Sequence, residues 1–459
     1  MSWKLGELAR ACSGTLRGSA DLEVTSVSTD TRSLGAGALF VAVKGESFDG
    51  HDFLAEAAKR GAAAALVSRA DESLALPAIV AADTVLALGA LARAHRAKFA
   101  GPVVAITGSN GKTTTKELCA RIFEAAGRRV HRTPGNLNNH IGLPLTILGL
   151  RAGDEVLLVE LGMNHSGEID ALTRIADPTV GAVTNVGSAH LGLLGSVEAI
   201  AAAKGELFER LRADATAIVN ADDANCVTQS ARFKGKKLRF GVKSAADFEG
   251  AVERLEHGAA LYTLRCPAGT ARIRMRAPGL HLVDNGLCAA SAAFATGALG
   301  ARPLDAIQRG LEAFESVPGR SALLRTPRGV LLIDDSYNAN PHSMARALET
   351  LGELRGAGRA LAVLGDMGEL GETAPELHAE LGRRVATARV DSLVTVGELS
   401  THTAAAARAG GVARVYETTS AEDAAARVRG EARSGDTVLV KASHGMKLER
   451  VVKLLMESC

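Results

Sequence analysis

The stretch "VVAITGSNGKTTTKE", residues 103–117, joins an apolar run to a glycine-containing loop and then to the start of a helical pattern. In the usual phosphate-binding loop, Gly-x-x-x-x-Gly-Lys-Ser/Thr, a glycine stands where this chain has Ile106, and the first glycine here is Gly108. The chemistry does not depend on that spacing. Backbone N–H groups and a helix N-terminus can hold phosphate oxygens, Lys112 can reach the β- and γ-phosphates, and the Thr113 hydroxyl can ligate Mg²⁺. A structural glycine turn is the alternative, but the succession of strand, loop and helix favours phosphate binding.

The overall composition is that of a globular chain with several domains. Its 459 residues, 47% hydrophobic and 23% charged, are enough for about three domains of roughly 150 residues each. A net charge of +2, scattered basic residues and only 3% aromatic residues argue against nucleic acid as a partner. The sequence shows no signal-peptide segment and no apolar run near the roughly 20 residues of a membrane span, so we expect a cytoplasmic protein. The six cysteines form no Cys-x-x-Cys pair, so we expect reduced thiols rather than zinc ligands or disulfides.

Apolar runs that alternate with helical periodicity predict an α/β protein of three domains, with expected bounds 1–82, 83–315 and 316–459. The first region contains short β-branched runs and an alanine-rich helical stretch at Phe53 to Ala65, followed by a helix that we expect to end at Gly101-Pro102. In the second region "VVAIT", "VLLVE" and "VGAVTN" predict buried parallel strands, and a β-rich patch follows residue 233. In the third region "VLLIDD", "LAVLGD", "SLVTVG" and "TVLVKAS" alternate with helices. We therefore expect a small α/β domain, a central P-loop domain with a parallel sheet, and a C-terminal Rossmann-like doubly wound domain.

Two polar residues that follow predicted strands of the central sheet can serve as metal ligands. Glu160 ends "VLLVE" and His190 closes "VTNVGSAH", and open parallel sheets place their ligand crevices at the carboxyl ends of strands. Taken alone, Glu160 could equally be a helix cap or an ion-pair partner, and a single histidine is more often structural. Because both follow strands of the sheet that carries the phosphate-binding loop, the pair favours a magnesium site.

Lys204 occupies a position where the helical pattern calls for an apolar side chain. In "SVEAIAAAKGELFERL", residues 196–211, the valine, isoleucine, leucine and phenylalanine residues share one helical face with Lys204. One interpretation is that its aliphatic stem lies along the edge of the core while the ammonium group reaches solvent. The other is that burial lowers its pKa and leaves a neutral amine, which can react with CO₂ to give a carbamate, an oxygen ligand for Mg²⁺.

Together these residues resemble the Mur ligases of peptidoglycan synthesis, whose phosphate-binding loop has the form Gly-x-x-Gly-Lys-Thr found here in "GSNGKTTT". The resemblance covers essentially the whole chain. Its most specific motifs are similar to those of the family branch that adds D-alanyl-D-alanine to a UDP-N-acetylmuramoyl tripeptide: "STDTRSLGAGALFVAVKGESFDGHDF", "TPGNLNNHIGLPLTIL", "VELGMNHSGEI", "AHLGLLGSVEAIAAAKGELF", "DDSYNANPHSM" and "LGDMGELG". The resemblance implies an ADP-forming ligase in which ATP phosphorylates the tripeptide carboxylate and the dipeptide amine then displaces phosphate.

The resemblance also implies roles for individual residues. Those expected to take part in catalysis are Lys112, His190, Lys204 and Arg320, and those expected to hold two Mg²⁺ ions are Thr113, Glu160, His190 and a carbamate on Lys204. Expected ATP contacts are Gly108, Ser109, Asn110, Gly111, Lys112, Thr113, Thr114, Asn285, Arg320 and Asp335. Expected substrate contacts are Ser28, Thr31, Arg32, Asn138, Asn139, Asn338 and Asn340, with the first domain binding the UDP-muramoyl group. From the residues alone, Asn138 and Asn139 are interpreted as turn formers.

The resemblance further implies a monomer whose C-terminal domain closes over the site. Arg320 and Asp335 would lie near the hinge, and closure would exclude water from the acyl phosphate. Some positions depart from the family pattern: Ala442 and His444 stand where Lys-Gly-Ser-Arg is frequent, Gly192 where Glu is frequent, and Leu282 where Asn is frequent. A titratable group thus replaces a fixed cation at position 444.

Three rival functions are compatible with parts of the sequence. A ligase that adds the third amino acid typically carries an Asp-Asn-Pro-Arg motif, which this chain lacks. A folate polyglutamate ligase shares the central domain but fits the first 82 residues poorly. A nucleotide-switched ATPase leaves Lys204 and the long N-terminal motif unexplained. No motif distinguishes lysine from diaminopimelate as the third residue of the tripeptide.

Overall fold

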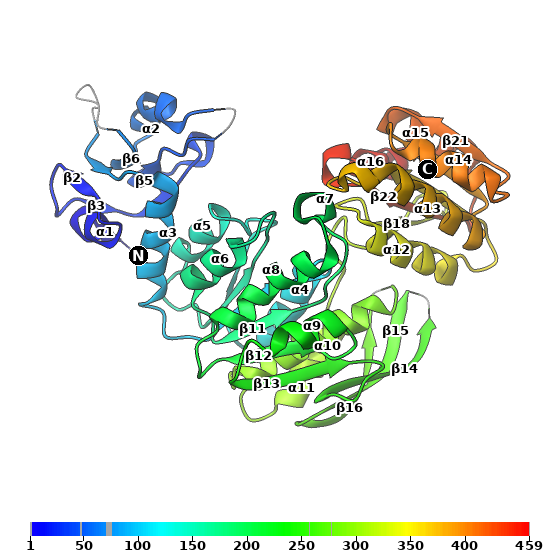
Figure 1. The fold of residues 1–459 in the computed structure, drawn as a ribbon, viewed down its shortest axis with the longest axis horizontal. Helices are drawn as coiled ribbons and strands as arrows, with labels where there is room; N and C mark the ends of the chain where they lie inside the picture. The colour runs from blue at the N-terminus through cyan, green and yellow to red at the C-terminus, as the bar shows by residue number, and fades with distance from the viewer. Residues whose placement is uncertain (1, 46–47, 70–75, 257, 277, 459) are drawn as a thin grey trace.

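The computed structural model describes residues 2–45, 48–69, 76–256, 258–276 and 278–458, which form three lobes along the chain (Figure 1). The principal sheets of the lobes have five, nine and six strands in chain order. Most strands run parallel and are covered by helices, so the expected three-part α/β architecture is confirmed. The N-terminal and C-terminal lobes stand on either side of the central lobe (Figure 1). None of the helices in the described ranges is both long and apolar enough to cross a bilayer.

The sheet of the N-terminal lobe has the order β2-β7-β6-β5-β4, with β4 to β7 parallel and β2 antiparallel. The predicted helix from Phe53 to Ala65 is wrong in its second half, because the helix ends at Lys59 and strand β6 begins at Ala64. Gly61, at a φ of +86°, follows the helix, and pairing of β6 with β5 and β7 buries its alanines completely. Tertiary pairing therefore overrides the helix propensity of alanine. The elements of this lobe are β1 (Trp3–Lys4), α1 (Leu5–Ala11), β2 (Thr15–Arg17), β3 (Glu23–Val24), β4 (Ser26–Ser28), η1 (Thr31–Ser33), β5 (Ala38–Val41), η2 (Gly50–Phe53), α2 (Leu54–Lys59), β6 (Ala64–Val67) and β7 (Ala78–Val80), with β1 and β3 forming a separate ribbon.

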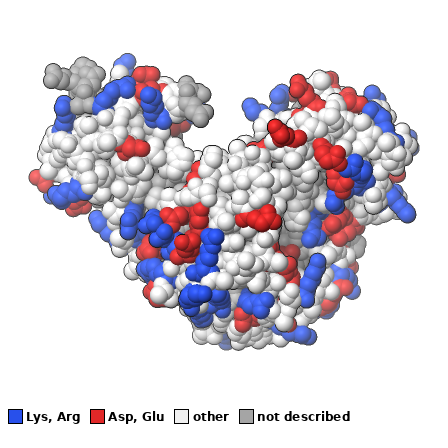
Figure 2. Space-filling view, in the orientation of Figure 1, with Lys and Arg blue, Asp and Glu red and all other residues white. Residues whose placement is uncertain are grey.

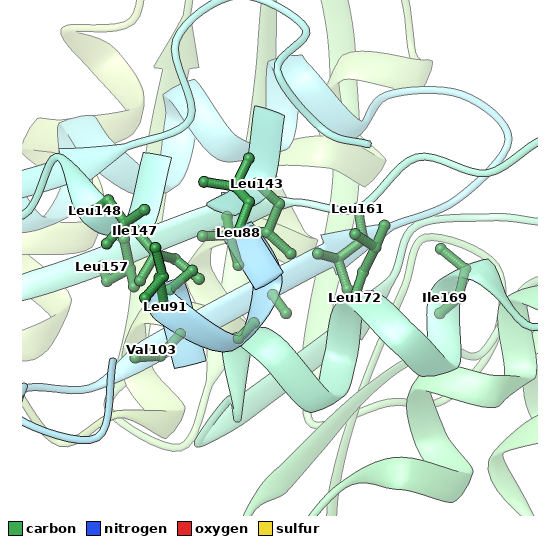
Figure 3. Close-up of a cluster of buried hydrophobic side chains, with 14 of the residues drawn as sticks. Leu88, Leu91, Val103, Leu143, Ile147, Leu148, Leu157, Leu161, Ile169 and Leu172 are labelled. Carbon is green, nitrogen blue, oxygen red and sulfur yellow. The ribbon is translucent and has the colours of Figure 1, made fainter. Parts of the chain in front are cut away.

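Helix α3 (Thr84–Arg96) joins the first lobe to the central lobe and packs against both. The carboxylate of Asp83 caps its first turn, and the helix ends before the expected Gly101-Pro102. Its Leu88 and Leu91 lie among leucines and isoleucines of the central lobe, as Figure 3 shows, and the same core extends to Trp3. One apolar core therefore fixes these two lobes to each other, while the division at residues 82 and 83 stays a prediction.

The sheet of the central lobe has the order β16-β15-β14-β13-β12-β11-β8-β10-β9. The predicted strands 103–107 and 156–160 coincide with β8 and β10, and the β-rich patch after residue 233 is confirmed as β13 to β16. The strands from β9 to β14 run parallel, and β15 and β16 extend the sheet with antiparallel pairing. Because β10 and β11 lie on opposite sides of β8, the loop after β8 stands at a switch point of the sheet, where open α/β folds bind ligands.

The elements of the central lobe follow in chain order. They are β8 (Val103–Thr107), α4 (Lys112–Ala125), β9 (Val130–Arg132), α5 (Gly142–Leu148), β10 (Val156–Glu160), α6 (Glu168–Ala176), β11 (Val180–Val183), α7 (Leu191–Leu194), α8 (Val197–Arg210), β12 (Thr216–Asn220), α9 (Ala224–Ser230), β13 (Lys236–Gly241), β14 (Phe248–Glu256), β15 (Ala259–Cys266), β16 (Gly269–Met275), α10 (His281–Ala295) and α11 (Pro303–Glu312).

The C-terminal lobe is doubly wound around the sheet β17-β18-β22-β19-β20-β21, in which only β17 is antiparallel. The four apolar runs of the third region form β18, β19, β20 and β22, each within one residue of the predicted start. The elements are β17 (Ala322–Arg325), β18 (Leu331–Asp334), α12 (Pro341–Leu354), β19 (Ala360–Gly365), η3 (Gly371–Thr373), α13 (Ala374–Thr387), β20 (Ser392–Val396), α14 (Ser400–Ala409), β21 (Val415–Thr418), α15 (Ala421–Glu431), β22 (Thr437–Lys441), η4 (His444–Met446) and α16 (Glu449–Ser458).

Candidate active site

The loop between β8 and α4 has a backbone that only glycine can adopt at two positions. Gly108 and Gly111 have φ values of +148° and +80°, and an added Cβ would lie 1.9 Å from Thr184 Oγ1 or 2.2 Å from Asn285 Oδ1. The Ser109 N–H donates to the Asn185 carbonyl at 3.0 Å, which ties the loop to the end of β11. Helix α4 begins immediately after Gly111, so its unpaired N–H groups face the loop and form an anion-binding cradle.

Lys112, the first residue of α4, reaches back over this loop. Its Nζ donates to the Gly108 carbonyl at 2.8 Å. Burial lowers the pKa of Lys112, and the nearby Glu160 carboxylate partly offsets that effect. The ammonium group is thus held where a phosphate oxygen on the loop would meet it.

Thr113 and Glu160 form a pair of oxygen donors beside the loop. The Thr113 hydroxyl donates to Glu160 Oε2 at 2.8 Å, and Asn138 Nδ2 donates to Glu160 Oε1 at 2.7 Å. Glu160 is 1% exposed, and β10 places it next to Ile106 of β8. A hydroxyl and a buried carboxylate in contact are hard oxygen ligands, so their chemistry fits Mg²⁺.

Lys204, on α8, is buried rather than extended into solvent. It is 1% exposed, and its side chain makes no hydrogen bond or ion pair with any described residue. Burial, and then the positive charge of Lys112, hold the pKa of Lys204 well below its usual value. This geometry argues against the solvent-reaching interpretation, and the lowered pKa favours the neutral form of an amine that lines the same cavity as Lys112.

His190 lies at the start of α7, at a φ of +67°. Its Nδ1 is 2.6 Å from Glu369 Oε2 of the C-terminal lobe, a close contact in which Nδ1 is not aligned for a hydrogen bond. The contact lowers the pKa of Glu369. Within the described ranges, no cluster of three or more His, Cys, Asp or Glu side chains forms a metal site. The expected ligands would not form such a cluster, because only Glu160 and His190 among them are of these residue types.

Side chains of the C-terminal lobe donate hydrogen bonds to the phosphate-binding loop region. Arg320 Nη2 donates to Thr113 Oγ1 at 3.2 Å, and its guanidinium lies 4.0 Å from the centre of the Tyr337 ring. Asn340 Nδ2 donates to Asn110 Oδ1 at 2.7 Å. These contacts join two lobes whose residues are more than 200 positions apart in sequence.

Two cavities meet at this junction. The first, of about 630 Å³, is lined by Lys112, Glu160, His190 and Lys204 on one wall and by the C-terminal lobe on the other, including Asn338, Asn340 and His444. The second, of about 360 Å³, lies behind the loop and is lined by Thr114, Asn285 and Asp335 among others. Asn110, Gly111 and Arg320 line both. Such a pair of chambers can hold a nucleotide base and ribose on one side of its phosphates and the reacting groups on the other.

Not every residue expected at the site is brought there. Ser28, Thr31 and Arg32 lie in the N-terminal lobe and line neither cavity, and the Arg32 guanidinium pairs with Asp30 at 2.7 Å. Residues 46–47 of the same N-terminal motif lie outside the described residues. Asn139 accepts hydrogen bonds from Ile141 N and Gly142 N at the start of α5, which is the turn-forming role.

Three residues of the site lack a role in the sequence analysis. Glu369 contacts His190, Tyr337 packs against Arg320 and His444, and the Lys441 Nζ donates to Asp335 Oδ2 at 2.5 Å. The signal for Lys441 is its place at the end of "TVLVK", after three apolar strand residues, which resembles the signal that pointed to Glu160. Glu369 and Tyr337 stand in loops, where no periodicity marks them.

Comparison with known protein families matches residues 106–293 to the Mur ligase middle domain, residues 319–444 to the Mur ligase glutamate ligase domain, and residues 23–96 to the catalytic domain of the Mur ligase family. The UDP-N-acetylmuramoyl-tripeptide--D-alanyl-D-alanine ligase of Escherichia coli (strain K12) is 38% identical over 461 residues, covering 100% of this chain and 99% of the relative. A crystal structure of MurF from Acinetobacter baumannii superposes with a TM-score of 0.90 at 33% identity, covering 100% of this chain and 99% of that chain. The MurF ligase from Thermotoga maritima in complex with ADP gives 0.84 at 30% identity, covering 95% and 98%.

Proposed function

This chain belongs to the Mur ligase family, and from that premise we propose that it is an ATP-dependent, ADP-forming ligase of peptidoglycan precursor synthesis. The reaction joins D-alanyl-D-alanine to a UDP-N-acetylmuramoyl tripeptide through an amide bond. Full-length similarity to ligases of that name in several bacteria supports this choice over the ligase that adds the third amino acid.

The observation that carries the proposal is the meeting of two lobes at the phosphate-binding loop. Lys112, Thr113 and Lys204 form one wall of the larger cavity, and Asn338, Asn340 and Glu369 form the opposite wall. A phosphoryl donor held on the loop would therefore face whatever amine the C-terminal lobe binds. An ATPase switch has no need of a second wall built by another lobe.

The first step is the transfer of the γ-phosphoryl group to the carboxylate of the tripeptide. Both reactants are anionic, so their approach is opposed by charge. Lys112 and Arg320 supply two cationic groups at the loop, and the N–H groups at the start of α4 would hold the phosphates. Mg²⁺ ions, when bound by Thr113 and Glu160 and by His190 with a carbamate of Lys204, would neutralise further charge on the phosphates and the carboxylate.

The second step is attack of the dipeptide amine on the acyl phosphate. The amine nitrogen bonds to the carbonyl carbon, the bond from that carbon to the phosphate oxygen breaks, and the amine loses a proton to solvent. Water would compete as the nucleophile, and the contacts of Arg320 and Asn340 with the loop would help to keep it from the C-terminal side of the cavity.

The structure of the Lys204 site supports its carbamylation. A neutral, unpaired amine that attacks CO₂ forms one N–C bond, releases one proton and becomes an anion beside the cationic Lys112. A Lys204→Ala protein should bind ATP but lose most turnover, and short carboxylic acids should restore part of it. Undiminished turnover would remove the carbamate from the mechanism.

The muramoyl substrate would span the broad hollow between the N-terminal and C-terminal lobes that Figure 2 shows. We propose that Ser28, Thr31 and Arg32 contact its uridine diphosphate, while Asn138, next to Glu160, lies near the reacting end. The base and ribose of ATP would lie against Asn285 and the Asp335 region in the smaller cavity. We propose that the enzyme acts as a cytoplasmic monomer.

Phosphate release from ATP tests the function directly. Purified protein is supplied with UDP-muramoyl tripeptide, with either lysine or diaminopimelate as the third residue, and with D-alanyl-D-alanine, D-alanine or a diamino acid as the amine. Release that requires both the tripeptide and D-alanyl-D-alanine is the expected result. Release with a muramoyl dipeptide and a diamino acid would instead identify the ligase that adds the third amino acid. Release that does not depend on the amine would support an ATPase switch.

A further inference from the structure

A loop of the C-terminal lobe, residues 366–371, packs backbone to backbone on the short helix α7 of the central lobe. The Gly192 N–H donates to the Glu369 carbonyl at 2.8 Å. A Cβ added at Gly192 would lie 2.5 Å from Gly371 N and 2.9 Å from Glu369 O, distances that no side chain tolerates. A side chain at position 192 would therefore strike the backbone of this loop, so the close contact seen here depends on Gly192.

Two residues at this contact hold a backbone conformation that is unfavourable for them. His190 and Glu369 have φ values of +67° and +61°, in the left-handed region that non-glycine residues rarely adopt. Such conformations cost on the order of 1–3 kcal/mol and persist where the surroundings fix them. Here both residues face each other across the lobe junction, and their side chains meet at 2.6 Å.

The contact uses one particular nitrogen of the imidazole ring. Glu369 Oε2 lies against Nδ1 of His190, which leaves Nε2 as the nitrogen that can serve a ligand in the cavity shared with Thr113 and Lys204. A histidine that binds a metal through one nitrogen usually presents the other to a carboxylate, which fixes the orientation of the ring. In this protein that carboxylate comes from a different lobe than the histidine.

We propose that Glu369 is a positioning residue that orients His190 for Mg²⁺, so that the second metal site is complete only when the C-terminal lobe is docked on α7. The inference rests on the proposed metal role of His190 and adds that docking of the C-terminal lobe controls this metal site. Because coupling between two equilibria is reciprocal, docking strengthens metal binding and metal binding strengthens docking. The amine-binding lobe must then be in place before the site can phosphorylate the tripeptide, which protects the acyl phosphate from water.

Binding of Mn²⁺, used in place of Mg²⁺, tests this without turnover. The full-length protein with a non-hydrolysable ATP analogue is titrated with Mn²⁺ and bound ions are counted by electron paramagnetic resonance. We expect two ions for the unaltered protein, and a Glu369→Ala change should weaken one of them by about 10–100-fold. Nucleotide affinity and the thermal midpoint should not change, since the Glu369 side chain is half exposed.

Two further variants separate docking from local charge. Glu372→Ala removes an exposed glutamate from the same region of the chain and should leave both ions bound. Gly192→Ala keeps the His190 and Glu369 side chains but disturbs the docking contact, so it should weaken binding of the same ion and increase the distance between spin labels on the two lobes. Full Mn²⁺ binding by Glu369→Ala or by Gly192→Ala would overturn the inference. A single Mn²⁺ in the unaltered protein would overturn the metal role of His190 and the inference with it.

Discussion

Replacing Lys204 with methionine should change how the stability of the protein depends on pH. Methionine keeps the apolar stem of the side chain and removes only the amine, which is 1% exposed and has no polar partner among the described residues. Burial and the charge of Lys112 hold the pKa of Lys204 well below its usual 10.5. The folded protein therefore carries a neutral amine over a range of pH in which the unfolded chain carries an ammonium group.

The sign and size of the effect follow from proton linkage. Between the lowered pKa and 10.5 the unfolded state binds a proton that the folded state does not, so the free energy of unfolding rises with pH. The slope is about 1.4 kcal/mol per pH unit for one proton. The loss of stability caused by the lowered pKa vanishes above pH 10.5 and reaches its full size below the lowered pKa. The Lys204→Met protein lacks this slope.

Urea unfolding of both proteins, followed by Trp3 fluorescence, measures the difference. Trp3 lies in the same apolar core as Ile200 and Leu207 of α8, so its signal reports the loss of the packing around Lys204. In CO₂-free buffers between pH 8.5 and 9.5, the wild-type minus variant difference should rise with pH, up to a limit of about 1.4 kcal/mol over this unit. Bicarbonate should then stabilise the wild type alone, because a carbamate forms on the folded protein.

Parallel pH profiles for the two proteins would refute this reasoning. They would mean that Lys204 keeps its proton in the folded state, and a charged ammonium cannot attack CO₂. Equal stabilisation of both proteins by bicarbonate would separately refute carbamate formation at this residue.

Three other changes have outcomes fixed by the structure. Gly111→Ala and Gly127→Ala should each add left-handed strain of about 1 kcal/mol. Only at Gly111 would the new Cβ strike another residue, Asn285 at 2.2 Å, so only Gly111→Ala should also weaken ADP binding in a calorimetric titration. Equal ADP affinities of the two variants would contradict this. Lys112→Met should keep the circular dichroism spectrum and lower turnover by at least about 100-fold in a phosphate-release assay, and near-normal turnover would show that the ammonium group is not at the phosphates. Burial raises the pKa of Asp284 from 3.8 to about 6, so its stabilising contribution is complete below 3.8 and is lost as pH rises through 6. Asp284→Asn should therefore be more stable than wild type at pH 7.5, by up to about 3 kcal/mol, and not at pH 3.5; a difference that is the same at both values, measured by urea unfolding, would contradict the raised pKa.

The strands and the loop of the site follow from local sequence because each is encoded within a few neighbouring residues. A run such as "VVAIT" is apolar throughout since both faces of a central parallel strand are covered, and β8 coincides with it. The glycines of the phosphate-binding loop are fixed by backbone geometry, which leaves a direct trace in the sequence. The helix expected to reach Ala65 failed because the helix propensity of alanine is a weak preference, and pairing with β5 and β7 overrode it.

Lys204 shows what helical periodicity in the sequence can and cannot predict. The helical pattern established that this lysine shares a face with apolar residues, and two interpretations followed from that single fact. The choice between them depended on whether the side chain at this position of α8 reaches solvent or stays inside the protein. Only the packed structure, with Lys204 1% exposed beside Lys112, distinguishes them.

The sequence by itself determined the α/β class, the positions of the central strands and the phosphate-binding loop, and the family to which the chain belongs, because these depend on local spacing and on motifs in a fixed order. The contact of Glu369 with His190, the need for glycine at position 192, and the different roles of Asn138 and Asn139 were decided only by the tertiary structure. Those features arise where backbones far apart in the chain are brought within a few ångströms, and no local pattern of residues records that approach.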